Sequence, residues 1–201
     1  AITPAMTTGA HLTEFARKYP KRFIDAGIAE EHALVLANAL ALSGMKPFVT
    51  IYSTFLQRGY DQVNHDIARM GGAVVVGIDR CGVIGEDGVS HQGIFDVSLL
   101  LPIPDITLAQ GKDAAESARL LATGFTMDSP FLLRYSKNTV PEQPLSTEPL
   151  PVGRWERLHE GEVTVISYGD FVGEAEEARR LLAMDGIEMG LVNARFLKPF
   201  D

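Results

Sequence analysis

Residues 73–78 read AVVVGI, an unbroken apolar run in which β-branched side chains dominate. A short run without alternation is typical of a central strand in a parallel sheet, where both faces of the strand are covered. Neighbouring parallel strands are joined by crossover connections, which are usually helices. The run therefore predicts an α/β fold, with helices on both faces of a mostly parallel sheet.

Other segments fit the same alternation of strands and helices. Residues 32–43 are almost wholly apolar and precede Gly44, so we expect a helix that is buried on all sides and ends at this glycine. The sequence DAAE at 113–116 resembles a capping box, which predicts a helix through about residue 127. Further elements are expected as strands at 47–52 and 131–135, and as a helix at 56–69.

The composition changes after residue 140. Residues 141–162 contain four prolines and few apolar runs, which is typical of a linker. A second β-α-β pattern follows, with strands expected at 163–167 and 189–192 and a helix at about 173–183. The expected organisation is a first domain at 1–140, a linker at 141–162 and part of a second α/β domain at 163–201.

Composition and charge argue against some classes of partner. The chain has 201 residues and a formal net charge of −8, which disfavours general affinity for nucleic acid or anionic lipid. No apolar run approaches the roughly 18 residues that a membrane span requires. The single cysteine, Cys81, rules out an intrachain disulfide and fits a cytoplasmic location. Both ends of the sequence look cut, so we expect a fragment of a longer polypeptide.

Ligands of parallel α/β sheets bind in loops at the carboxyl ends of the strands. In this chain such loops follow Tyr52 and Asp79, and the second loop is polar and rich in glycine. Two adjacent carboxylates, Glu30 and Glu31, precede the apolar helix at 32–43. A solvated helix start explains one of them through the helix dipole, and the other is a candidate for chemistry.

Four stretches carry a resemblance to a known family. They are GIAEEHA at 27–33, IYSTFLQRGYDQ at 51–62, IDRCGVIGEDGVSHQG at 78–93 and LLRYSKN at 132–138. Together they closely resemble the 1-deoxy-D-xylulose-5-phosphate synthases, thiamine-diphosphate enzymes of the transketolase superfamily. The resemblance covers essentially the whole chain. It implies a transketolase-type pyrimidine-binding domain, followed by the start of the C-terminal domain.

The resemblance assigns Glu30 as the catalytic acid, which hydrogen-bonds the N1′ atom of the cofactor's aminopyrimidine ring. That role requires a carboxyl group in a dry, apolar pocket, where it can share a proton. The alternative is a helix-start acid that the helix dipole favours, and Glu31, where the family usually has Gln, fits this alternative better. Phe55 matches the aromatic residue that stacks on the ring, and Ile28 and Arg58 match positions that line it.

The resemblance also assigns an acceptor side to the pocket. Arg80 precedes a Gly-rich loop that holds Asp87 and His91. Arginine pairs with phosphate through two hydrogen bonds, and histidine can donate or shuttle protons. In the family these positions, with Tyr52 and Lys137, face glyceraldehyde 3-phosphate, and His91 is also expected to act in catalysis. Taken singly, an Asp-Gly pair is a turn and a lone histidine is more often structural.

Two residues depart from the family pattern. The family usually has R-Y-P-R-G where this chain has R-Y-S-K-N, so Lys137 replaces an arginine and binds phosphate as a point charge rather than a fork. Cys81 replaces the usual alanine and is expected to be an inert small residue rather than an oxidisable thiol. The G-D-G…N segment that binds magnesium and diphosphate in the superfamily is not found in this sequence, so no metal ligand is expected here.

The implied activity is the condensation of pyruvate with D-glyceraldehyde 3-phosphate to 1-deoxy-D-xylulose 5-phosphate and CO2. A homodimeric transferase would perform it with thiamine diphosphate and Mg2+. The chain alone would hold half of the active site and is expected to be inactive by itself. Two alternatives stay open. One is the C-terminal subunit of a split transketolase or related thiamine-diphosphate enzyme, and the other is a non-catalytic dimerisation module.

Overall fold

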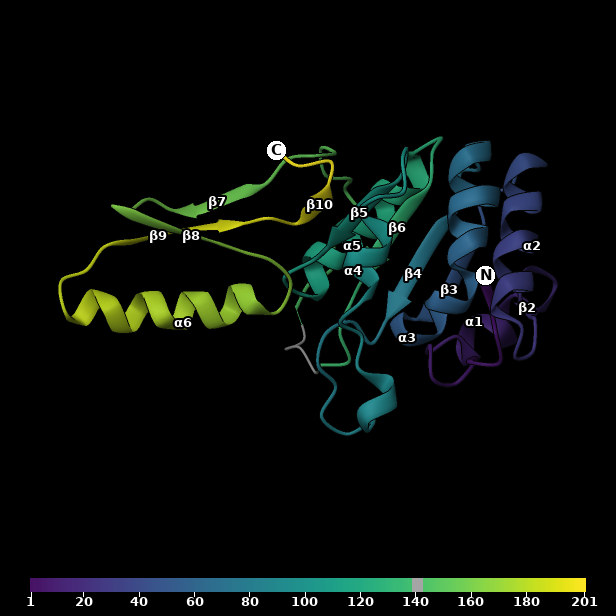
Figure 1. Ribbon diagram of the computed structural model, residues 1–201, viewed down its shortest axis with the longest axis horizontal. Helices are drawn as coiled ribbons and strands as arrows, with labels where there is room; N and C mark the ends of the chain where they lie inside the picture. The colour runs from purple at the N-terminus through teal and green to yellow at the C-terminus, as the bar shows by residue number, and fades with distance from the viewer. Residues whose placement is uncertain (139–142) are drawn as a thin grey trace.

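The computed structural model describes residues 1–138 and 143–201 and contains two sheets (Figure 1). The larger sheet has the strand order β10-β5-β6-β4-β3-β1-β2, and its pairs are parallel except for β10 with β5. The smaller sheet has the order β7-β9-β8, in which β7 is antiparallel and β8 parallel to β9. The expected α/β class with a mostly parallel sheet is therefore confirmed.

The strands of the larger sheet are β1 (Ile2–Thr3), β2 (Ile24–Asp25), β3 (Phe48–Tyr52), β4 (Val75–Asp79), β5 (Thr107–Gln110), β6 (Phe131–Arg134) and β10 (Phe196–Lys198). Those of the smaller sheet are β7 (Glu156–His159), β8 (Val163–Ser167) and β9 (Met189–Asn193). The α-helices are α1 (Thr13–Lys18), α2 (Glu30–Leu42), α3 (Ser53–Leu56), α4 (Asp96–Leu100), α5 (Ala114–Thr126) and α6 (Phe171–Met184). Short 3-10 turns occupy Pro20–Arg22, Gln57–Gly59 and Val89–His91.

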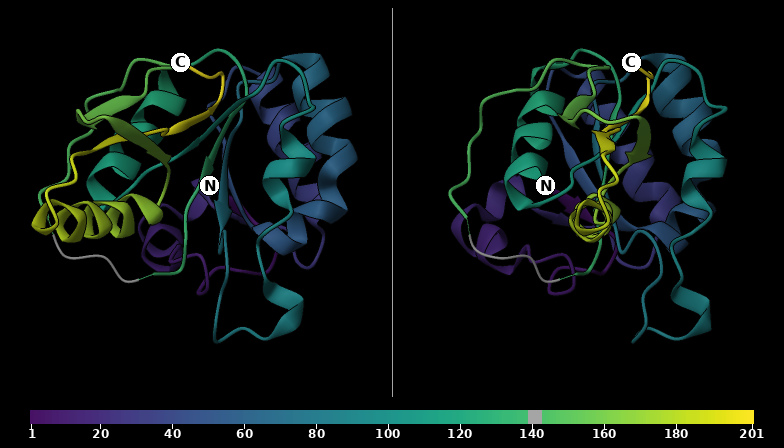
Figure 2. Two further views of the ribbon diagram at one scale, coloured as in Figure 1. Left: turned by 60° about the vertical axis from the view of Figure 1, so that its left-hand side comes forward. Right: turned by 90° about the vertical axis from the view of Figure 1, so that its left-hand side faces the viewer.

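Strand β4, which contains most of the AVVVGI run, lies in the middle of the larger sheet and is buried along its whole length. Its alternate side chains enter different clusters of the core. Val76 and Ile78 pack in the cluster that contains Leu34 of α2, whereas Val75 packs in the cluster that contains Leu120 of α5. Helices therefore cover both faces of the sheet (Figure 2), which explains why this strand shows no polar alternation.

Two helix ends form as the sequence predicts. Gly44 follows α2 in the left-handed conformation, with a φ of +87°, which glycine adopts without steric cost. Asp113 caps α5, because its side chain accepts a hydrogen bond from the backbone N–H of Glu116 at 2.7 Å. The Glu116 side chain in turn accepts from the backbone N–H of Lys112 at 2.8 Å. The predicted start of this helix is therefore confirmed, with the reciprocal bond coming from Lys112, one residue before the N-cap.

The expectation that the helix at 32–43 is buried on all sides is wrong. Ala33 and Ala37 of α2 are fully buried, but Val35 and Leu42 expose 42% and 53% of their surface. A helix that lies on one face of a sheet presents only part of its circumference to the sheet. On the opposite side of α2, Val35, Ala39 and Leu42 form an exposed apolar stripe.

The segment expected as a helix at 56–69 is helical, but it is not one α-helix. It passes from α3 through the 3-10 turn at 57–59 to a π-helical stretch at Gln62–Ala68. The polarity pattern does not distinguish these forms, because the 3-10 and π stretches are short and the period of each differs from that of an α-helix by less than one residue per turn.

The second unit begins earlier than the sequence suggests. Strand β7 lies inside the segment expected to be a linker, 141–162, and pairs with β9. Its sequence, ERLH, has no strong strand signal, and its pairing partner is far away in the chain. The expected boundary between residues 140 and 141 lies outside the described residues. Strand β10 then returns to the edge of the larger sheet.

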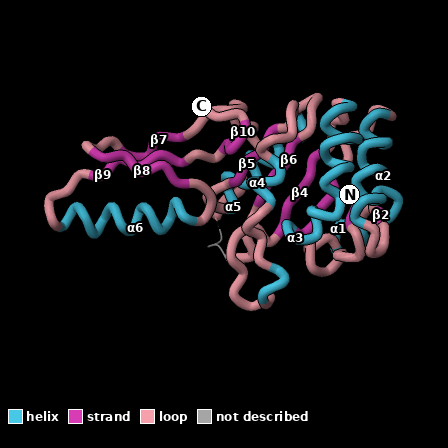
Figure 3. Tube along the Cα trace, in the orientation of Figure 1, coloured by secondary structure: helices cyan, strands magenta, loops and turns pink. Residues whose placement is uncertain are grey.

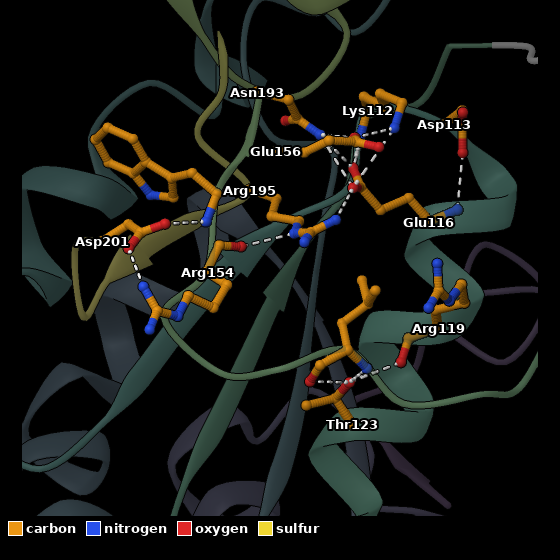
Figure 4. A network of polar contacts seen from close by, with 12 residues as sticks. Lys112, Asp113, Glu116, Arg119, Thr123, Arg154, Glu156, Asn193, Arg195 and Asp201 are labelled. Atoms are coloured by element: carbon orange, nitrogen blue, oxygen red, sulfur yellow. Dashed lines mark hydrogen bonds and ion pairs between the residues drawn. The ribbon is translucent and has the colours of Figure 1, made fainter. Parts of the chain in front are cut away.

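A buried polar network joins the two units (Figure 4). Glu116 of α5 accepts hydrogen bonds from Asn193 Nδ2 at 3.0 Å and from Arg195 Nη1 at 3.2 Å. Lys112 donates to Glu156 of β7 at 2.6 Å. Because Glu116, Asn193 and Arg195 are at most 9% exposed, a partner lost from this network is not replaced by water.

In the part of the chain that the structure describes, no helix is long and apolar enough to cross a membrane.

Candidate active site

The parallel strands bring several of the candidate residues to one edge of the larger sheet. Tyr52 and Asp79 are register partners at the ends of β3 and β4, and Arg134 ends the neighbouring strand β6. Glu30 lies shortly after the end of β2. The loop between β4 and α4 extends beyond this carboxyl edge (Figure 3). The carboxyl edge is where ligands of parallel sheets bind.

Glu30 and Glu31 have opposite environments, although they are adjacent. Glu30 is the first residue of α2 and is 3% exposed, whereas Glu31 is exposed. The Oε2 atom of Glu30 lies 3.6 Å from Nη1 of Arg58, whose side chain is 60% exposed. A carboxylate thus enters the protein interior while its cationic partner stays at the surface. Of the two acids, Glu30 is the one with the environment that acid–base chemistry requires.

The turn before Glu30 depends on Asp25, which the sequence analysis did not single out. Its Oδ1 accepts from the backbone N–H groups of Ala5 and Gly27 at 2.9 and 3.0 Å, and its Oδ2 accepts from the Thr7 hydroxyl at 2.9 Å. The bond from Gly27 is the main cause of the lowered pKa of Asp25. The signal in the sequence was the spacing Asp-x-Gly, which is typical of an Asx turn.

An aromatic wall lies beside the loop that follows β4. The rings of Tyr52 and Phe55 stack with centroids 5.3 Å apart and an interplanar angle of 16°. The ring of His91 meets Phe55 edge-on at 5.4 Å. The Ser90 hydroxyl lies 2.8 Å from Nδ1 of His91. Among the described residues of the loop, none makes a hydrogen bond with the other ring nitrogen, Nε2. The structure therefore brings Tyr52, Phe55 and His91 together.

Arg80 is the centre of the polar part of the site. Its guanidinium donates from Nη2 to the Tyr52 hydroxyl at 2.6 Å and from Nη1 to Oδ2 of Asp87 at 3.0 Å. The guanidinium carbon also lies 4.3 Å from the centroid of the Tyr52 ring. Arg80 has a φ of +57°, and its N–H donates to the Asp79 carboxylate at 2.6 Å, which stabilises this uncommon conformation. Burial raises the pKa of Asp79.

Lys137 reaches the same cluster from the segment after β6. Its Nζ donates to Oδ1 of Asp87 at 2.7 Å and to Oε2 of Glu86 at 3.3 Å. The hydrogen bond from Lys137 is the main cause of the lowered pKa of Asp87, and the bond to Asp87 is the main cause of the raised pKa of Lys137. Asp87 thus lies between two cations, Arg80 and Lys137.

The loop that carries Asp87 is built largely by its own contacts. Gly82 and Gly93 exchange backbone hydrogen bonds at its neck, at 2.7 and 2.8 Å. The Gln92 side chain accepts from the Ile84 N–H at 2.7 Å and donates to the carbonyls of Ile84 and Gly88. This self-contained loop positions Asp87 and His91 at the carboxyl edge.

Two buried residues next to the site, Arg134 and Asp96, support the loop after β4. Arg134 makes a bidentate ion pair with Asp96, the first residue of α4, with N–O distances of 2.6 and 3.1 Å. Both side chains are buried. Arg134 lies in the stretch 132–138 that carries the resemblance, but the sequence did not indicate that it pairs with Asp96, since the two residues are far apart in the chain. The pair ties the end of the loop after β4 to the strand that leads to Lys137.

Cys81 is buried beneath the loop, and its thiol donates to the Ile78 carbonyl and to Asp96. Burial raises the pKa of this thiol well above its usual value. These surroundings support the interpretation of Cys81 as an inert small residue.

The candidate residues form two groups and one outlier. Glu30 and Arg58 form the first group. The second group comprises Tyr52, Phe55, Arg80, Asp87, His91 and Lys137. Ile28, the outlier, is 80% exposed, so it can contact a ligand only from the solvent-facing side of the site. The described residues contain no cluster of three or more His, Cys, Asp or Glu that could hold a metal ion.

Two family models match the chain. Residues 1–143 match the transketolase pyrimidine-binding domain, and residues 153–201 match the transketolase C-terminal domain. Curated proteins named 1-deoxy-D-xylulose-5-phosphate synthase match over the whole chain, at 45% identity in Listeria monocytogenes serotype 4b and 48% in Desulforudis audaxviator. The chain spans 34% and 32% of the length of these two relatives.

Solved structures agree with the fold. A structure described as a split-gene transketolase in an inactive beta4 tetramer has a TM-score of 0.87 and 27% identity, and it covers all of this chain and 66% of the other. A transketolase from Pichia stipitis shares the fold at a TM-score of 0.83 and 18% identity. The chain therefore belongs to the transketolase family, of which it carries the pyrimidine-binding domain and a portion of the C-terminal domain.

Proposed function

We propose that the chain is part of a thiamine-diphosphate-dependent transferase that condenses pyruvate with D-glyceraldehyde 3-phosphate to 1-deoxy-D-xylulose 5-phosphate and CO2. The observation that carries the proposal is the combination of a buried carboxylate, Glu30, and a two-cation cluster, Arg80 with Lys137, at one edge of the sheet. Relatives at 45–48% identity that bear the name of this synthase support the choice of substrates. The product would feed isoprenoid, thiamine and pyridoxal synthesis.

The residues at the carboxyl edge fit one half of thiamine diphosphate. A buried carboxyl group and an aromatic wall are suited to a flat, nitrogen-containing ring. When bound, the cofactor would supply a nucleophilic thiazolium carbon. Glu30 would hold a proton shared with N1′ of the aminopyrimidine, Phe55 would stack on that ring, and Ile28 and Arg58 would line it. Mg2+ would be held by residues outside this chain.

The acceptor phosphate would bind between Arg80 and Lys137. Both side chains already bind a carboxylate, Asp87, so the cluster accepts anions of this geometry. A phosphate that enters competes with Asp87 for the same donors. Tyr52 would contribute its hydroxyl beside Arg80, and His91 would hold or move a proton at the acceptor's oxygen.

The intact enzyme would be a cytoplasmic homodimer. The exposed apolar stripe on α2, which includes Val35 and Leu42, supports a protein contact on that face. The chain by itself would be inactive, because the diphosphate-binding half of the site is supplied by another domain.

A second candidate is the C-terminal subunit of a split transketolase or related enzyme. The similarity to the split-gene transketolase structure favours it. A diphosphate-binding domain encoded upstream in the same reading frame would decide against this candidate. A non-catalytic dimerisation module has less support. Such a module has no reason to keep Glu30, Arg80 and His91 together at the carboxyl edge of the larger sheet.

The experiment compares Glu30→Ala with Glu31→Ala in the complete polypeptide, meaning residues 1–201 together with the diphosphate-binding domain. Loss of a general acid–base group is expected to lower turnover of pyruvate and glyceraldehyde 3-phosphate by about 10²–10⁴-fold. The exposed Glu31 is the matched control, and its replacement should leave turnover unchanged. Circular dichroism confirms that both variants fold. Turnover near the wild-type value in Glu30→Ala would overturn the assignment.

A further inference from the structure

A turn of the C-terminal unit contacts the carboxyl ends of two strands of the larger sheet. The turn, residues 168–170, joins β8 to α6, whose first residues lie nearest the larger sheet in Figure 1. The guanidinium of Arg134 lies 5.9 Å from the centroid of the Tyr168 ring. Gly169 has a φ of +59°, and a β-carbon at this position would collide with the Gln110 side chain. The turn therefore fits closely against β5 and β6.

The third residue of the turn contacts the segment that carries Lys137. Asn138 Nδ2 donates a hydrogen bond to Oδ2 of Asp170 at 2.6 Å. The backbone N–H of Asn138 also lies 3.3 Å from the Ser136 hydroxyl, to which it donates. Lys137, between these two residues, points its ammonium at Asp87. Asp170 thus fixes the residue next to the lysine that would bind phosphate.

This contact matters because of the residue type at position 137. A lysine side chain is a flexible stem that ends in a point charge, and its rotamer freedom opposes a fixed position. An arginine would select its geometry through its own planar fork. In the R-Y-S-K-N segment, Asp170 instead holds the backbone beside Lys137 through the Asn138 side chain. The R-Y-P-R-G pattern has glycine at the position of Asn138, and glycine has no side chain that could bind Asp170.

We propose that Asp170 is a positioning residue, which holds Lys137 through Asn138 and so sets the affinity of the acceptor site for phosphate. The inference rests on the proposed function for the identity of the acceptor. It assigns a role at the site to the C-terminal unit, from which no other described residue is a candidate for the site. Asp170 does not touch the acceptor and acts only through the position of Lys137.

The main experiment measures steady-state kinetics of Asp170→Ala in the complete polypeptide. One hydrogen bond of this kind corresponds to about a three- to tenfold change in affinity. We expect the KM for glyceraldehyde 3-phosphate to rise by that factor, while kcat and the KM for pyruvate stay unchanged. The KM for D-glyceraldehyde, which lacks the phosphate, should also stay unchanged. A role in folding alone would not separate the two acceptors.

Three variants serve as controls. Asp170→Asn keeps an acceptor oxygen for Asn138 and should restore most of the affinity. Asn138→Gly should reproduce the effect of Asp170→Ala, and the two changes together should cost no more than either alone. Glu174→Ala removes another acid from the first turn of α6, so it tests for an effect of helix charge and should change nothing.

A second measurement separates this proposal from the proposed function. Inorganic phosphate is titrated into the 201-residue chain and into its Asp170→Ala variant, and binding is followed by NMR chemical shifts. We expect weaker binding to the variant. If phosphate binding weakens but the complete polypeptide makes no 1-deoxy-D-xylulose 5-phosphate, the proposed function fails and the positioning role stands. If the synthase is active and neither KM nor phosphate binding changes in Asp170→Ala, the positioning role is wrong.

Discussion

Replacing Asp96 by alanine is expected to destabilise the chain, because it leaves the buried guanidinium of Arg134 without its carboxylate. The two side chains are 1% and 5% exposed, so water cannot take the place of the lost partner. Removing one member of a buried ion pair costs about 3–5 kcal/mol. Gln110 still accepts a hydrogen bond from Arg134, which places the expected loss near the lower end, at about 3 kcal/mol.

The assay is urea denaturation of the 201-residue chain, followed by circular dichroism and by the fluorescence of Trp155. A small domain has a free energy of unfolding of about 5–15 kcal/mol, so the expected loss moves the midpoint visibly. The matched control is Glu160→Ala, which breaks an ion pair with Arg157. The side chains of Glu160 and Arg157 are 78% and 63% exposed, and an exposed ion pair contributes about 0.2–1 kcal/mol to the free energy of unfolding.

A double variant tests the physical reason. Asp96→Leu combined with Arg134→Met removes both charges and leaves none uncompensated in the interior. Such replacements are often neutral or stabilising, so the double variant should be more stable than Asp96→Ala. The reasoning is refuted if Asp96→Ala costs no more than Glu160→Ala, or if the double variant is the least stable of the three.

Two further predictions concern ionisable groups. Hydrogen bonds from Gly27, Thr7 and Ala5 lower the pKa of Asp25 below the ordinary 3.8. The stability that ionised Asp25 contributes is therefore present above that value and is lost as the pH falls through the lower folded-state pKa. The difference in unfolding free energy between wild type and Asp25→Ala should therefore be constant near neutral pH and shrink below about pH 4; a difference that does not shrink would contradict this. Burial and the raised pKa of Cys81 predict that iodoacetamide modifies its thiol far more slowly in the folded chain than in urea, as mass spectrometry can measure. Equal rates in the two states would show that the thiol is accessible.

Local sequence signals predicted the central elements of the fold. The apolar run at 73–78 predicts β4 because a strand covered on both faces has no polar alternation. The capping box at Asp113 predicts the start of α5, since its hydrogen bonds join residues close in sequence. Strands β1 and β2 have two residues each, and β10 has three, so none carries a measurable period. Their pairing partners decide their conformation.

The candidate site shows the same division between local and distant contacts. The motifs identified Arg80, Asp87 and Lys137, and the structure brings these three together. The sequence did not identify the Asp96–Arg134 pair or the Asn138–Asp170 contact, because each joins segments that only the folded sheet makes neighbours.

We propose above that this chain is part of a synthase that joins pyruvate to glyceraldehyde 3-phosphate. The most direct measurement incubates the complete polypeptide with isotope-labelled pyruvate, glyceraldehyde 3-phosphate, thiamine diphosphate and Mg2+, and identifies the products by mass spectrometry. We expect labelled 1-deoxy-D-xylulose 5-phosphate and CO2 from the complete polypeptide, and no product from residues 1–201 alone. Transfer of a two-carbon unit between sugar phosphates, with pyruvate left unconsumed, would contradict it in favour of a transketolase.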